Sequence, residues 1–242
     1  MSESVTVTID PHVHSEASYD GHEPVELLLE QASEIGLDGI VVTDHDEIEA
    51  SRRAADIAPE YDLLGIPGVE VSTAAGHLLA IGVDERPEPR QPFDDTVEAV
   101  REMGGVAVVP HPFQRTRHGV RKKRLSDCDA IEVFNAWVFT GYRNRRARRY
   151  AEKHGYPGVA ASDAHSATFL GRAYTELDID GVETRHDLDG EAVVDAIRAG
   201  EADIHGRRQP LRTSFKHYAK GAGRKASWAA QPYVPSVVTN LF

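Results

Sequence analysis

Residues 5–24, "VTVTIDPHVHSEASYDGHEP", join an apolar segment to a dense group of histidines and acids. The "VTVTID" segment is rich in β-branched residues and predicts a strand. His12 and His14 follow it two residues apart, so on an extended chain both imidazoles point to the same side. This spacing would let one metal ion bind two nitrogens from a single rigid segment.

The rest of the chain alternates between strand-like and helix-like segments. Further strands are predicted at residues 37–46, 62–73, 77–84, 106–112, 129–136, 157–165 and 173–179. Helices are predicted at residues 23–36, 47–58, 94–105, 140–155 and 190–200. This alternation indicates βα units and a parallel sheet. The number of strands favours a closed or nearly closed α/β barrel, with a doubly wound open sheet as the alternative.

Charge is distributed unevenly along the chain. The net charge is −12, but residues after Asp203 contain no acid and seven Lys or Arg side chains. We expect one domain over residues 1–206 and a basic C-terminal tail, 207–242, packed on the acidic body. An acidic body argues mildly against a protein that wraps nucleic acid.

Three features predict a cytoplasmic protein. The chain has a single cysteine, Cys128, so no disulfide framework is expected. Its N-terminus lacks a basic segment followed by an apolar one, and no apolar run is long enough to cross a membrane. The oligomeric state stays open.

Histidines and acids gather where predicted strands end. Six of the 12 histidines lie beside a strand core: His12, His14, His45, His77, His111 and His165. Glu70 lies within a strand, Asp163 ends one, and Asp44 precedes His45. Each of these residues alone would more often be a satisfied polar group or a helix cap. Gathered at one barrel rim, they would repel one another or be costly to desolvate without cations, so metal binding is favoured.

Seven short motifs occur in an order that resembles the PHP superfamily, the polymerase and histidinol phosphatase domain. They are "DPHVHSEASYDG", "VVTDHD", "GVEVS", "HLLAIG", "VVPHP", "IEVFNA" and "ASDAH". The resemblance covers residues 5 to about 205. It implies a distorted (β/α)7 barrel with two or three divalent ions, which could be Mn, Zn or Fe.

The resemblance also implies a ligand set. The first ion would be held by His12, His14, Glu70 and Asp163. The second would share Glu70 and take His77 and His111. The third would take Asp20, His45 and His165, although His22 is an alternative to Asp20. Glu70, Asp163 and Asp44 are the candidate catalytic residues, Asp44 by orienting a ligand.

Such a centre suits hydrolysis of a phosphate ester by a metal-activated water. Arg115 and Arg117 follow His111 closely and are the candidate ligands of a substrate phosphate. The acidic body favours a small phosphorylated metabolite or nucleotide as substrate. A nuclease acting on oligonucleotides, a non-catalytic metal-binding module and an amidohydrolase are the alternatives. The arginine-rich segment at 142–149 is interpreted as a solvated helix face.

Overall fold

A computed structural model describes residues 4–114, 117–138, 140–200 and 202–208. Its strands are β1 Ser4–Val13, β2 Gly39–Val42, β3 Leu64–Gly65, β4 Gly68–Ser72, β5 His77–Ile81, β6 Val106–Val109, β7 Ala130–Asn135, β8 Gly158–Ala161, β9 Ala173–Asp180 and β10 Ala202–Gly206. Its α-helices are α1 Val25–Glu34, α2 Glu49–Ile57, α3 Phe93–Glu102, α4 Gly141–His154 and α5 Gly190–Ala199. Short 3-10 segments occur at Ala58–Tyr61, Ala167–Phe169 and Arg185–Asp187. The α/β class is therefore confirmed.

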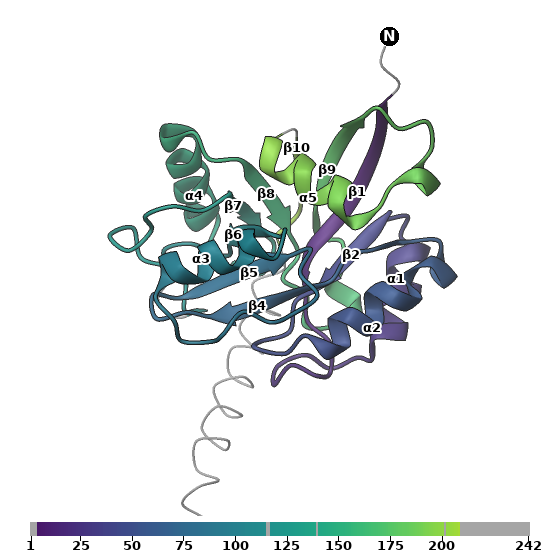
Figure 1. Ribbon diagram of the computed structural model, residues 1–242, viewed down its shortest axis with the longest axis horizontal. Helices are drawn as coiled ribbons and strands as arrows, with labels where there is room; N and C mark the ends of the chain where they lie inside the picture. The colour runs from purple at the N-terminus through teal and green to yellow at the C-terminus, as the bar shows by residue number, and fades with distance from the viewer. Residues whose placement is uncertain (1–3, 115–116, 139, 201, 209–242) are drawn as a thin grey trace, which may run out of the picture.

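The strands form two five-stranded sheets, ordered β10-β9-β1-β2-β3 and β4-β5-β6-β7-β8. Two isolated parallel bridges join the sheets at one end, Val13 to Ala164 and His45 to Glu70. Figure 1 shows α1 and α2 on the side of β1 and β2, and α3 and α4 beside the other sheet. Within the described residues, the strands therefore lie in two sheets that these bridges connect.

The prediction of a parallel sheet holds for β1–β2, β2–β3, β6–β7 and β7–β8 but not for the other strand pairs. Strand β5 runs antiparallel to both β4 and β6, and β9 runs antiparallel to β1 and β10. The β4–β5 connection is only residues 73–76, which is too short for the crossover that parallel strands need. Gly76 makes this turn with φ +145°, and a Cβ there would lie 2.3 Å from the carbonyl oxygen of His118. The reversal brings the first residue of β5 to the rim where β4 ends.

Local sequence explains where the elements begin and end. Every residue of β2 and β6 is buried, as expected for apolar strands covered on both faces. Helix α5 begins after Asp189, whose side chain accepts a hydrogen bond from the Ala192 amide at 3.0 Å. It ends at Gly200, which adopts the left-handed conformation with φ +80°.

Two further sequence-based expectations concern the C-terminal tail and membrane-spanning helices. Of the tail at 207–242, only Arg207 and Arg208 lie within the described residues, so its packing stays a prediction. Among the described helices, none is both long and apolar enough to cross a membrane.

Candidate metal centre

The H-x-H pair lies at the end of β1, with His12 within the strand and His14 just after it. His12 and His14 are buried, and their Nε2 atoms lie 3.1 Å apart. The pairing of β1 with β2 shifts register between Asp10 and Val13, which lie on either side of His12. The prediction that both imidazoles point to one side of the strand is thus confirmed.

Glu70 lies in the middle of β4 and is fully buried. Its Oε1 lies 2.7 Å from His77 Nδ1 and 3.0 Å from His111 Nε2. Its Oε2 lies 3.5 Å from Nε2 of both His12 and His14. The two carboxylate oxygens therefore face two different sets of histidines.

A second carboxylate, that of Asp163, lies just after β8, and its two oxygens also have different partners. Its Oδ1 lies 3.6 Å from His14 Nε2 and 3.4 Å from His165 Nδ1. Its Oδ2 accepts hydrogen bonds from Asn135 Nδ2 at 2.9 Å and from Arg117. One oxygen thus faces the histidines while the other is held by donors from the chain.

Asp20 reaches the cluster although it comes six residues after His14. Its Oδ2 lies 3.5 Å from His45 Nε2 and 3.3 Å from His165 Nε2. The loop that carries it folds tightly onto residue 15, and a Cβ at Gly21 would lie 1.8 Å from the Ser15 carbonyl oxygen. The alternative, His22, is exposed at the surface.

The structure brings all nine predicted ligands together. Five overlapping groups of three, each with donor atoms within 4.8 Å of one another, contain His12, His14, Asp20, His45, Glu70, His77, His111, Asp163 and His165. Glu70 Oε2, His45 Nδ1 and His111 Nδ1 are buried and make no hydrogen bond of good geometry, although Glu70 Oε2 lies 3.0 Å from His45 Nδ1. Buried polar atoms without partners are costly, and a divalent cation would satisfy them. The mixed nitrogen and oxygen donors therefore fit the metal centre that the sequence predicts.

The imidazoles of the cluster differ in pKa: those of His14 and His77 are lowered, whereas those of His12 and His45 are raised because neighbouring carboxylates outweigh burial. Burial lowers the pKa of His77 to about 4, although Glu70 opposes the shift. Burial, followed by the neighbouring imidazoles, lowers the pKa of His14 well below its usual range. His12 differs because Asp163 and Glu70 overcome the burial and raise its pKa. Metal binding requires neutral imidazole, so these two lowered pKa values suit it.

Backbone strain coincides with the cluster. His111 and Asp163 adopt positive φ values of 30° and 53°, and Phe113 and His118 adopt 67° and 53°. Non-glycine residues rarely adopt such angles, and they persist where the surrounding structure holds them for function.

Sequence reasoning missed the residues that hold the ligands in place. Glu132 on β7 is buried; its Oε1 lies 3.1 Å from His12 Nδ1, and its Oε2 accepts from the His111 amide and from Asn135 Nδ2. Trp137 stacks on His165 with ring centroids 4.9 Å apart. An acid inside the apolar run "AIEVF" was the available signal for Glu132.

The remaining site predictions have separate outcomes. Asp44 is buried and accepts hydrogen bonds from the Ser15 amide at 2.8 Å and the Ser15 hydroxyl at 2.5 Å. It lies 4.0 Å from His14 Nδ1, so it fixes the loop beside the ligands rather than joining a ligand group. Arg117 lies at the cluster against Asp163 and Trp137. Arg115 falls outside the described residues.

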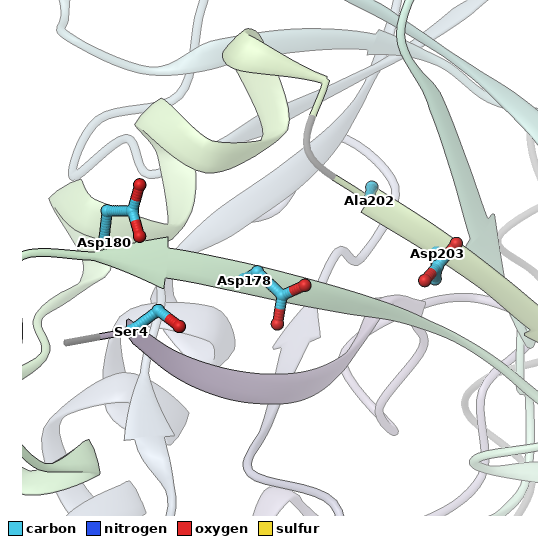
Figure 2. Close-up of a pocket in the computed structure, with 5 residues that line it drawn as sticks. All are labelled: Ser4, Asp178, Asp180, Ala202 and Asp203. Atoms are coloured by element: carbon cyan, nitrogen blue, oxygen red, sulfur yellow. The ribbon is translucent and has the colours of Figure 1, made fainter. Parts of the chain in front are cut away.

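A separate hollow lies on the face of β9 and β10. Figure 2 shows the residues that line it, Ser4, Asp178, Asp180, Ala202 and Asp203. Asp178 already accepts a hydrogen bond from Thr6 at 2.6 Å. Ser4 begins β1, whereas His12 lies near its other end, so this hollow is distinct from the metal centre.

Comparison with known proteins agrees with this geometry. Residues 10–120 match the PHP domain, and residues 141–202 match the PHP-associated family. An uncharacterized protein of Methanocaldococcus jannaschii is 26% identical over 225 residues, which cover 88% of this chain and 90% of that protein.

Two solved structures share the fold. A two-domain protein from Bacteroides vulgatus, which contains a predicted PHP-like metal-dependent phosphoesterase, has a TM-score of 0.69 at 18% identity, covering 89% of this chain and 70% of its own. A lesion-specific endonuclease from Pyrococcus furiosus has a TM-score of 0.54 at 18% identity, covering 83% and 58%. The chain therefore contains a PHP domain followed by a PHP-associated region, and it shares the fold of these PHP-like structures.

Proposed function

We propose that this protein hydrolyses phosphate esters at a trinuclear centre. The first ion takes His12, His14, Glu70 and Asp163; the second takes Glu70, His77 and His111; the third takes Asp20, His45 and His165. The observation that carries the proposal is that the two Glu70 oxygens face different histidines, as a bridging carboxylate requires.

When bound, divalent ions would supply a water nucleophile near neutral pH and neutralise charge on the phosphoryl oxygens. The chain's own residues would position the ester. Arg117 lies over Trp137, with its guanidinium carbon 5.8 Å from the ring, and would donate to a phosphate oxygen. Asn135 holds Asp163 Oδ2, so that the other oxygen stays directed at the histidines.

We also propose that β1, β2 and β4 to β8 form the distorted (β/α)7 barrel. The two isolated bridges support it because they link β1 to the end of β8 and β2 to β4 at the rim that carries the ligands. A barrel of this type presents its chemistry at such a rim.

The substrate would be an ester at the end of a molecule. All nine ligands are largely buried, and the most accessible side chain, that of Asp20, is 19% exposed. Such a site admits a terminal phosphate more readily than the middle of a chain. A small phosphorylated metabolite or nucleotide fits this requirement. An exonuclease is the second candidate, favoured by the basic surface described below.

The test is a substrate screen with the full chain loaded with Mn²⁺ or Zn²⁺. We expect release of phosphate or nucleotide from esters, and no release when a chelator is present. As a matched pair, Glu70→Gln should be inactive while His154→Ala, a change on α4, keeps its activity. Hydrolysis by the Glu70→Gln variant at the rate of the parent protein would contradict the proposal.

A further inference from the structure

Basic residues are strongly segregated in this acidic chain. Residues 111–154 contain 12 of the 20 Lys and Arg side chains that precede residue 204, but only four of the 39 acids. The segment comprises the loop between β6 and β7, β7 itself and α4. A positive region of this density attracts polyanions even when the net charge is negative.

The described part of the loop contacts α4, which lies near β7 in Figure 1. Arg143 on α4 donates to the Phe113 carbonyl oxygen at 2.8 Å, and Arg146 lies over the Phe113 ring at 4.7 Å. Lys122 on the loop lies 5.6 Å from the Tyr150 ring. We call this the basic surface; its described members are Arg117, Arg121, Lys122, Lys123, Arg124, Arg143, Arg145, Arg146, Arg148, Arg149 and Lys153.

The basic surface is not neutralised from within the protein. In the described part of the chain, Arg117 is its one member paired with a carboxylate. Of the ten described arginines outside this surface, five pair with acids: Arg52, Arg53, Arg101, Arg185 and Arg198. The solvent face of α4 also repeats like charges at helical spacing, as in Arg145 and Arg149, which destabilises a helix. A solvated face in so acidic a chain would be expected to carry acids at these positions.

The surface begins at the metal centre. Asn135, which donates to Asp163, is bonded through its backbone to the Asn144 side chain on α4, at 3.3 and 3.0 Å. Tyr142, in the first turn of α4, is 62% exposed. From there α4 extends about 20 Å away from the centre. A row of cations that starts with an exposed aromatic ring is the pattern that binds single strands, because the bases stack and the phosphates pair with the cations.

We propose that the basic surface binds single-stranded nucleic acid and directs its end to the metal centre. The proposal rests on the second candidate function, the exonuclease, and the binding step itself does not depend on hydrolysis. Arg145, Arg146 and Arg149 contact phosphates, and Tyr142 stacks on a base.

The test is fluorescence anisotropy with a labelled oligodeoxythymidylate and the full chain in chelator, which separates binding from cleavage. Substituting Arg145, Arg146 and Arg149 together by Gln should weaken binding roughly a hundredfold at about 0.1 M salt and lower the salt slope by about two. The matched control substitutes Arg52, Arg53 and Arg198, which are also exposed, and should bind as the parent does. Melting temperature should not fall in the α4 variant, because repulsion is relieved.

Tyr142→Ala separates nucleic acid from other polyanions. It should weaken oligonucleotide binding roughly five- to a hundredfold but leave binding of inorganic polyphosphate unchanged. Parent-like binding by the α4 triple variant would overturn the proposal and place binding elsewhere. An equal loss of polyphosphate affinity in the Tyr142→Ala variant would overturn it too. So would a parent protein that binds polyglutamate, anionic vesicles or duplex more tightly than the single strand. If binding follows the prediction but no strand is cleaved on metal loading, the proposed hydrolysis fails while the surface stands.

Discussion

Glu132 offers a sharp test of how the centre is held, because it supports two ligands without being one. Its carboxylate accepts hydrogen bonds, so His12 carries a proton on Nδ1, and the neutral imidazole that a metal requires then has its lone pair on Nε2. In the Glu132→Gln variant, the amide oxygen can keep the His111 amide and Asn135 as donors. The amide nitrogen of the new glutamine then faces His12 Nδ1, so two N–H donors point at each other and no hydrogen bond can form between them.

The cheapest relief of this contact reverses the tautomer of His12. The proton moves to Nε2, the atom that lies 3.5 Å from Glu70 Oε2, and the lone pair is lost to a metal. Losing such a supporting contact typically weakens metal binding by about 10- to 100-fold, or about 1.4–2.7 kcal/mol. Calorimetric titration with Mn²⁺ measures this directly.

Glu176→Gln is the matched control for charge, because Glu176 is a partly exposed carboxylate on β9, away from the cluster. We expect its metal affinity to stay within twofold of the parent, which is an order-of-magnitude bound for a distant site. Parent-like affinity in Glu132→Gln, with the fold intact by circular dichroism, would refute the assignment of the His12 tautomer.

Three further predictions concern other parts of the molecule. Glu70→Ala should abolish hydrolysis and lower the metal content while the chain still folds; His154→Ala should be near neutral in the same assays. Arg117→Gln should lower kcat/KM roughly tenfold to a hundredfold, mainly through KM, because one charge-assisted contact is lost; an unchanged kcat/KM would exclude Arg117 from substrate binding. Burial raises the pKa of the Cys128 thiol, and Asp127 and Asp129 add to the shift. Cys128 should therefore react with a thiol reagent only after unfolding, and rapid labelling of the native protein would contradict its burial.

The sequence predicted which side chains gather at one rim better than it predicted the strand directions. The His12–His14 spacing and the acids at strand ends are local features, and each follows from periodicity along one segment. Whether β5 runs parallel or antiparallel depends on its partners across the sheet, which local periodicity does not encode. His77 nevertheless lies in the cluster because it begins an antiparallel strand, rather than because it ends a parallel one.

Supporting residues escaped prediction for a related reason. Glu132 lies inside an apolar strand, and its partners His12 and His111 come from β1 and the end of β6. Nothing near Glu132 in the sequence indicates those contacts. Asp20 illustrates the reverse case, since the loop in which Gly21 closely approaches Ser15 brings it to the cluster from six residues after His14.

The central claim, that the nine ligands hold a trinuclear centre, is tested most directly by the metal content of the full chain. Purified protein is reconstituted with Mn²⁺ or Zn²⁺, freed of loose metal, and measured by elemental analysis against protein concentration. The proposed ligand sets predict about three ions per chain, and no fewer than two when the third is weakly held. One ion or fewer per chain after reconstitution would contradict it.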